Sequence, residues 1–283
     1  SSEAVEVKTP VLHSQGQFTL TLPAQASPHL SLLASIDLQD AGQAWRYYPR
    51  LAMGQPLVDY LTAALQKGQV DGATLLWNGP LDEFPYHDGG GVFQVAVPLR
   101  HARFQFDPAW QPLDDLSLDL LFHNDELEMR SQQARLGQAH SGRIFAWFPT
   151  LTEDSALYIN ADIEGEAAAV QDYLRHSGVA DSVGAAMKAL PITKPLTGQL
   201  QLVIPLSGDP VKVLGNVHFN QNRLQVAALG LPLEQVTGDL WFSDQETHFS
   251  NLSAKLWGQP LTLDYQGQQQ ADGYQVNLGM RGR

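Results

Sequence analysis

The sequence contains no cysteine. This absence excludes disulfide bonds, thiolate metal sites and a cysteine nucleophile from the chain. It is compatible with either of two compartments, the cytoplasm or a bacterial periplasm.

Basic residues are also scarce: 17 lysines and arginines stand against 30 aspartates and glutamates, which gives a net charge of −13. A nucleic-acid-binding protein needs a basic surface that replaces the counterions of the phosphates, and no cluster of lysines and arginines occurs here. The composition therefore predicts no nucleic acid as a partner.

Long apolar runs are absent too. No stretch approaches the roughly 20 apolar residues that cross a bilayer, and no stretch reads as a signal peptide. The sequence begins SSEAVEV without a methionine and stops directly after a strand-like pattern. We therefore expect 1–283 to be one continuous segment of a longer protein, with any export signal or membrane anchor outside it.

What the sequence does contain is alternation of apolar and polar residues with a period of two. It is clearest at 18–22, 30–38, 93–97, 157–163 and 274–280. Such alternation is typical of strands with one apolar and one polar face, as in antiparallel sheets. The sequence therefore predicts a mostly β protein built on an antiparallel sheet.

Two places have helical spacing instead, at 40–67 and at 165–190. In the first, Pro56 begins a short amphipathic run, and Gly68 is predicted to end it. The second contains two short apolar runs separated at 177–178. Each place thus predicts a pair of short helices between strands.

One strand is written twice. LSLDLLF at 116–122 returns as VTGDLWF at 236–242, so that Asp, Leu and Phe recur 120 residues apart, from 119 to 239. The helical places recur in the same order relative to these strands. We therefore expect approximate tandem repeat units at 30–156 and 157–282, whose stacked copies share one continuous core.

The order of strand, paired short helices, glycine-led strand, turn and D-L-x-F strand resembles the AsmA-like superfamily of Gram-negative envelope proteins. The likeness is most specific at LPITKPLTG (190–198), DLWF (239–242) and AKLWG (254–258), and it extends over essentially the whole chain. It implies an elongated, curled β-sheet with an open apolar groove. It further implies a periplasmic segment of an inner-membrane-anchored, bridge-like protein that moves phospholipid between the inner and outer membranes.

The resemblance also implies the partners. Phospholipid acyl chains would lie in the groove, membranes would be contacted through other parts of the parent protein, and envelope proteins are further candidates. No cofactor is implied. If the apolar strand faces line such a groove, we expect these residues to form its lining: Phe18, Leu20, Leu32, Ile36, Phe93, Val95, Leu118, Leu120, Phe122, Ile159, Ile163, Leu202, Ile204, Val217, Phe219, Leu240, Phe242, Val276 and Leu278.

The same apolar faces would also suit the closed core of a β-sandwich, as in a passive periplasmic scaffold or protein-interaction domain. The tandem pattern and the small amount of helix favour the groove. An aspartate at position 240 is expected to unfold a closed core, because a buried unpaired charge is costly, but to leave an open groove folded. The recurring Asp119 and Asp239 are expected to keep the outer side of the sheet solvated; contact with lipid head groups is the alternative.

Signals for chemistry are weak. His87 and Asp88 precede three glycines, which resembles an oxyanion loop of esterases, but no G-x-S-x-G motif occurs and a hairpin turn explains the glycines. The nine histidines contain no H-x-x-x-H pair. Acidic pairs at 114–115 and 125–126 could serve a glycosidase, but acids in turns are normally solvated. We therefore predict a protein that is not an enzyme and holds no metal.

Overall fold

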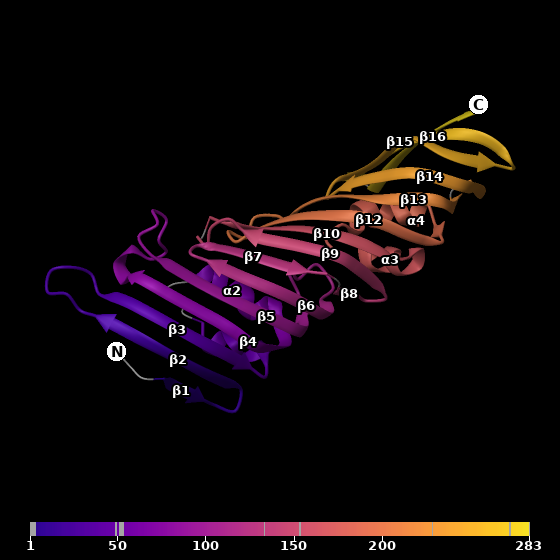
Figure 1. The fold of residues 1–283 in the computed structure, drawn as a ribbon. Helices are drawn as coiled ribbons and strands as arrows, with labels where there is room; N and C mark the ends of the chain where they lie inside the picture. The colour runs from indigo at the N-terminus through magenta and orange to yellow at the C-terminus, as the bar shows by residue number, and fades with distance from the viewer. Residues whose placement is uncertain are drawn as a thin grey trace.

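The computed structural model describes residues 4–48, 50, 54–132, 134–152, 154–227, 229–271 and 273–282. They form one elongated sheet of 17 strands with a few short helices (Figure 1). The predicted class, a mostly β protein with an antiparallel sheet and short helices, is confirmed. The strands are β1 (Val5–Lys8), β2 (Leu12–Thr21), β3 (His29–Leu38), β4 (Leu65–Pro80), β5 (Val92–Phe104), β6 (Leu113–His123), β7 (Glu126–Ser131), β8 (Ala134–Leu136), β9 (Ala139–Phe148), β10 (Ala156–Glu166), β11 (Ile192–Thr193), β12 (Pro195–Pro205), β13 (Lys212–Val226), β14 (Leu231–Ser243), β15 (Glu246–Leu256), β16 (Gln259–Gln270) and β17 (Gly273–Gly282).

The helical elements lie between strands. They are η1 (Ala41–Arg46), α2 (Gln55–Ala64), η2 (Leu81–Glu83), α3 (Ala167–Arg175), η3 (Ala180–Gly184) and α4 (Ala185–Ala189). The predicted helical places therefore hold η1 with α2, and α3 with η3 and α4.

Strand pairing follows the order of the chain, from β1 at one end of the sheet to β17 at the other (Figure 1), and every described pair is antiparallel. β7 and β8 together fill one place between β6 and β9, and the short β11 lies beside β13. The helical segments are inserted between paired strands, since β3 pairs with β4 and β10 pairs with β12. The sheet is therefore a long meander.

The register aligns the apolar residues of successive strands. Phe18 of β2 lies opposite Leu32 of β3, which lies opposite Trp77 of β4, which lies opposite Phe93 of β5. Directly opposed residues point to the same side of a sheet. One side of the sheet is therefore apolar from strand to strand, and we call it the inner face.

The helices pack on the inner face. α2 buries Leu57, Val58 and Leu61, α3 contacts β9, β10 and β12, and η3 contacts β14, β15 and β16. A hydrogen bond of 2.7 Å from the Ser182 hydroxyl to the Ser243 carbonyl ties η3 to β14. The helices thus cover apolar surface that the sheet alone would leave in water.

The predicted helix stop at Gly68 is wrong. α2 ends at Ala64, because Leu65 already has an extended backbone (φ −89°, ψ 98°) and begins β4. Gly68 lies inside β4, with its α-carbon close to Leu99 and Ala102 of β5. The helix therefore passes directly into a strand without a glycine cap.

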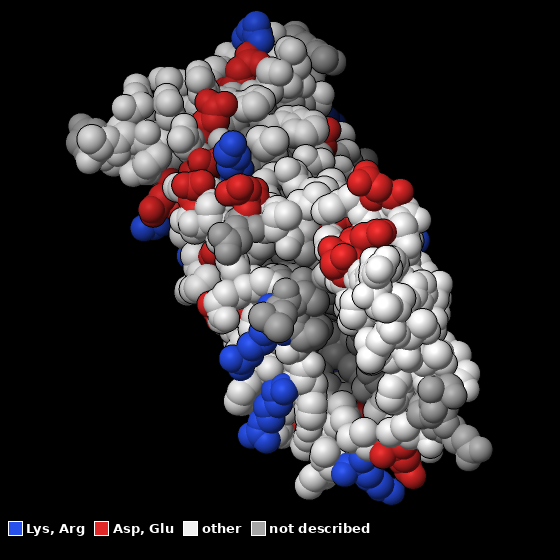
Figure 2. Space-filling model, turned by 90° about the vertical axis from the view of Figure 1, so that its left-hand side faces the viewer, with Lys and Arg blue, Asp and Glu red and all other residues white. Residues whose placement is uncertain are grey.

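The sheet curls around its inner face. β5 and β12 are separated by four strands, a distance of about 24 Å across a flat sheet. Phe104 of β5 and Leu200 of β12 nevertheless line the same cavity. The view toward the β1 end shows the surface hollowed between two walls (Figure 2).

Bulges recur at the same places in the two halves. His101 and Gln221 have φ values of 49° and 55°, and Asp115 and Gln235 both have 51°, so each pair is separated by 120 residues. His101 and Gln221 lie where the strand register shifts, between Leu99 and Ala102 and between Asn220 and Asn222. An extra residue bends a strand and increases its twist. The same bend is built twice, in agreement with tandem repeats; the unit boundaries, 30–156 and 157–282, remain a prediction.

Close packing on the inner face gives a test of this register. Gly215 lies opposite Leu200 and Phe242, and a Cβ there would lie 2.6 Å from the Gln199 carbonyl oxygen and collide with the Phe242 ring. We expect Gly215→Ala to lower the free energy of unfolding by about 1–3 kcal/mol. Gly279→Ala in β17 is the matched control, since its nearest neighbour would be 3.7 Å away, and it should change stability by less than about 0.5 kcal/mol. Urea denaturation measures both; equal effects would contradict the described register.

Candidate functional site: the apolar inner face

The strand register places all nineteen predicted lining residues on the inner face. Each is joined to the others through a continuous series of opposed residues from β2 to β17. In the twice-written strand, Leu120 and Phe122 correspond to Leu240 and Phe242 on this face. The inner face is thus one apolar surface that runs across the whole sheet.

Exposure of the inner face changes along the sheet. Near the two ends the face is open: Leu20 of β2 is 43% exposed, and Phe18 and Val276 are similarly exposed. In the middle it is covered: Leu240 is 1% exposed, and Ile159, Leu202 and most of their neighbours are buried. The inner face is therefore an accessible surface at both ends and a hydrophobic core between them.

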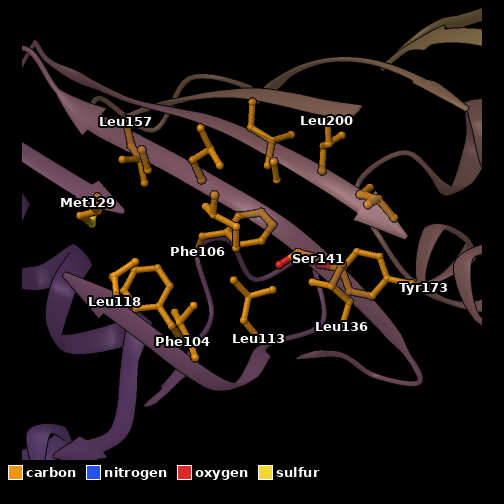
Figure 3. A pocket seen from close by; sticks show the side chains of 17 residues that line it. Phe104, Phe106, Leu113, Leu118, Met129, Leu136, Ser141, Leu157, Tyr173 and Leu200 are labelled. Atoms are coloured by element: carbon orange, nitrogen blue, oxygen red, sulfur yellow. The ribbon is translucent and has the colours of Figure 1, made fainter. Parts of the chain in front are cut away.

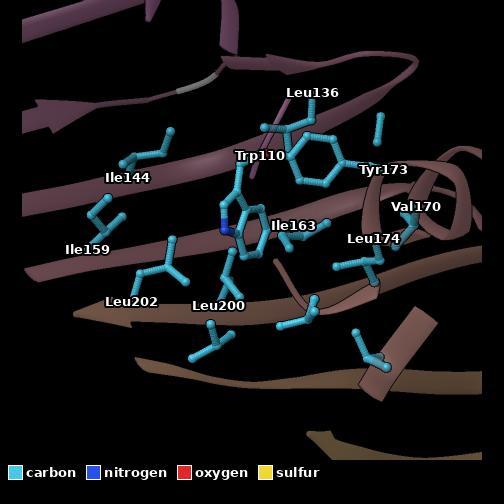
Figure 4. Close-up of a cluster of buried hydrophobic side chains, with 14 of the residues drawn as sticks. Trp110, Leu136, Ile144, Ile159, Ile163, Val170, Tyr173, Leu174, Leu200 and Leu202 are labelled. Carbon is cyan, nitrogen blue, oxygen red and sulfur yellow. The ribbon is translucent and has the colours of Figure 1, made fainter. Parts of the chain in front are cut away.

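Side chains from outside the strands fill the middle. Tyr60 of α2 lies between Phe104 of β5 and Phe148 of β9, with ring centroids 6.4 and 6.1 Å away. Trp110, from the loop at 105–112, packs against Tyr173 of α3 at 6.0 Å and lies among Ile163 and other strand residues (Figure 4). The side chains of Tyr60 and Trp110 thus cover two parts of the inner face.

A cavity of about 50 Å³ remains beside these residues, on the inner sides of β5 to β12. Seventeen side chains line it, and Ser141 and Tyr173 are the ones among them with a polar group (Figure 3). Four predicted lining residues are present, namely Leu118, Ile159, Ile163 and Leu202. The cavity can hold apolar groups and offers almost no polar partner.

Several residues of this cavity were not predicted. Ile144 and Ala146 lie in the stretch IFAWF and point to the inner face. The residues between and after them, Phe145 and Trp147, are also apolar and stack on the outer face, with ring centroids 5.6 Å apart. Because apolar and polar residues do not alternate here, the sequence does not indicate which side of β9 faces inward. Tyr173 could have been found, because Asp-Tyr-Leu occurs in both helical places, at 59–61 and at 172–174.

The recurring aspartates lie on the outer face. Arg100 of β5 donates a hydrogen bond of 2.7 Å to Asp119, and His218 of β13 lies 2.9 Å from Asp239. Both carboxylates reach solvent, so each pair contributes at most about 1 kcal/mol. Both aspartates thus lie on the solvated outer face, opposite the apolar inner face.

The weaker candidates for chemistry are dispersed. His87 and Asp88 lie in a turn, but the expectation that Asp114 and Asp115 lie in a turn is wrong, because both are in β6, where they pair with Arg103 and His101. His87 lies between η2 and β5, with Nδ1 3.0 Å from the Asp125 carboxylate. Over the described ranges, no group of three His, Asp or Glu residues is arranged to hold a metal ion. In the same part of the chain, no helix has both the length and the apolarity to cross a bilayer.

Burial changes the acidity of several tyrosines. It raises the pKa of Tyr173 and, together with the negative charge of Asp107, the pKa of Tyr60. Burial also raises the pKa of Tyr48 to about 12. These phenols keep their protons at neutral pH and can donate hydrogen bonds.

Comparison with known proteins identifies relatives of the chain. The model of the YhdP family, described as YhdP protein, matches residues 1–283. The intermembrane phospholipid transporter YhdP of Escherichia coli (strain K12) is 36% identical over 278 residues, which are 98% of this chain and 22% of that protein. The chain thus spans about a fifth of the length of this relative. No solved structure matches significantly.

Leu240 is 1% exposed, so the result expected for a closed core applies at position 240. Leu240→Asp places an unpaired charge in the core, so we expect a loss of about 3 kcal/mol or more in the free energy of unfolding. Leu20→Asp on the same face, and Trp241→Asp on the exposed outer face, should each cost less than about 1 kcal/mol. Urea denaturation followed by circular dichroism distinguishes them. Wild-type stability of the Leu240 variant would show that the middle of the face is open.

The raised pKa values predict sensitivity to alkali. Above pH of about 10, the tyrosines of the unfolded chain ionise, whereas Tyr60 and Tyr173 hold their protons in the folded state. The folded state then binds more protons, so the free energy of unfolding falls as the pH rises. We expect this fall to be shallower in Tyr60→Phe and Tyr173→Phe, and all three proteins to behave alike between about pH 7 and 9. Identical alkaline slopes would contradict the burial of these hydroxyls.

Proposed function

Because the chain belongs to the YhdP family, we propose that it is a segment of a bridge-like lipid-transfer protein that moves phospholipid between the inner and outer membranes of a Gram-negative envelope. The inner face is the path of the acyl chains. One observation carries the proposal: the register makes a continuous apolar surface from β2 to β17 that is exposed at both ends. The E. coli relative, named as an intermembrane phospholipid transporter, supports the same role.

The energetic reason for such a surface is the cost of moving acyl chains through water. Each buried CH₂ group is worth about 0.8 kcal/mol, so a tail of roughly 16 carbons resists transfer by about 12 kcal/mol. A continuous apolar face removes most of this cost, while the head group stays in solvent beyond the strand ends. Many similar weak contacts favour movement along the face, and no covalent chemistry is needed. The segment acts without being an enzyme.

The proposed setting is the periplasm. The parent protein would be anchored in the inner membrane, and contacts with both membranes and with envelope proteins would be made by parts outside 1–283. The ion pairs between neighbouring strands on the outer face suit a surface in water.

The covered middle requires movement. Leu240 and most of its neighbours in the middle of the inner face are buried, so lipid reaches this part of the face only when α2, α3 or the loop at 105–112 moves away from the strands. The same observation favours a second candidate function, a passive periplasmic scaffold or protein-interaction domain in which the inner face is an ordinary core. The two functions differ in whether lipid reaches the inner face.

Photocrosslinking in the full-length protein, in native membranes, tests this difference. A photoreactive residue at Leu20 reports on the inner face, and one at Leu33 is the matched control, since Leu33 is 51% exposed on the outer face of the neighbouring strand. Val276 and Trp241 provide the corresponding pair near the other end. We expect phospholipid adducts at 20 and 276 and few at 33 and 241.

Equal labelling of the two faces, or no adduct at either inner position, would exclude the lipid path and favour the scaffold. The comparison reports on access to lipid, because all four positions are exposed.

A further inference from the structure

The central cavity contains one polar group that lacks a partner. Ser141 is engaged: its hydroxyl accepts a hydrogen bond of 2.9 Å from the Ala134 amide and donates one of 3.2 Å to the Gly142 carbonyl. Tyr173 is 3% exposed, lines the cavity, and makes no hydrogen bond through its hydroxyl to any residue that the structure describes. Its ring extends from α3 toward the cavity (Figure 3). A hydroxyl without a protein partner in an apolar cavity keeps a free hydrogen-bond donor, which a ligand in that cavity can use.

The first repeat contains a corresponding tyrosine in its helical insertion, although this tyrosine is not part of the lining of the cavity. Tyr60 occupies the middle of Asp-Tyr-Leu in α2, as Tyr173 does in α3. Its hydroxyl is buried and has no hydrogen-bond partner among the described residues. Its ring contacts Phe104, which also lines the cavity. Both helical insertions thus place a phenol with an unused donor on the apolar inner face.

The surroundings define the chemistry of the missing partner. The lining of the cavity contains no lysine, arginine or histidine, so an ionised phosphate or carboxylate would be buried there without a counter-charge, at high cost. A pure hydrocarbon would leave the phenol unpaired. A neutral carbonyl attached to an apolar chain meets both requirements, since it accepts one hydrogen bond and carries no charge.

We propose that the hydroxyls of Tyr173 and Tyr60 are binding sites for the acyl ester carbonyls of diacyl lipids. Each phenol donates one hydrogen bond to an ester as the lipid lies on the inner face. The inference rests on the proposed function, because it names the part of the phospholipid that the path recognises. Two such sites, one in each repeat, would make the path selective for ester-linked lipids over lipids without a carbonyl.

Comparison of an ester lipid with its ether analogue tests the proposal. The probes are dipalmitoyl phosphatidylglycerol and the dihexadecyl ether with the same head group, bound to the full-length protein in detergent and detected by native mass spectrometry. We expect the wild type to prefer the ester. Tyr173→Phe should weaken ester binding about two- to tenfold and leave ether binding unchanged, and the double variant with Tyr60→Phe should show no preference. Tyr158→Phe, on the outer face beside Trp147, is the matched control and should behave as wild type.

Stability separates recognition from folding. The Tyr60 hydroxyl is buried without a partner among the described residues, so Tyr60→Phe should raise the Tm by roughly 2–4 °C; a lower Tm would reveal a structural partner and overturn the proposal. Ester and ether lipids bound equally by every variant would also overturn it, while leaving the lipid path intact. Stronger competition by palmitic acid than by the diacyl ester would assign the sites to a free fatty acid instead. If the wild type bound neither lipid, the proposed function itself would fail.

Discussion

The strands from β2 to β17 each have an apolar side, and the register of the meander puts these sides together on one face. A slip of one residue between two strands would turn a whole row of apolar side chains to the outer face. Features throughout the molecule maintain this alignment. Gly215 leaves room for Phe242 on the inner face, and ion pairs such as Arg100 with Asp119 join neighbouring strands on the outer face. The curl of the sheet then brings strands as distant as β5 and β12 around one cavity.

Under the proposed function, the inner face has two roles that place opposite demands on it. Stability requires that apolar surface be covered, and α2, α3 and Trp110 provide that cover in the middle of the sheet. Passage of a lipid requires that the same surface be reachable, as it is at Leu20 and Val276. Acyl chains resemble the covering side chains chemically, so exchange of one for the other need cost little free energy. Short helices attached at strand ends are suited to this exchange, because they can separate from the strands without breaking a strand pair.

Much of the fold can be predicted from the alternation of apolar and polar residues. A strand with one solvated and one apolar face requires this alternation, with a period of two residues. The strands around Leu32, Leu240 and Val276 were predicted on this basis, with the correct side assigned to the inner face. The stretch IFAWF gives no such signal, since both of its sides are apolar. Contacts made by Trp110 and Tyr60 depend on how distant strands curl toward each other, and local pattern contains no information on this. His101 and Asp115 adopt positive φ without a glycine to mark it, so the bulges were not foreseen.

The paired bulges, at His101 and Asp115 and again at Gln221 and Gln235, bend the strands at the same place in each predicted repeat. Curvature is then a local property of the unit and does not depend on how many units follow one another. Duplication of a unit would lengthen the curled sheet without changing its curvature or the width of its groove. For the proposed bridge, the number of copies would then set the length of the path, with no change in the cross-section of the groove.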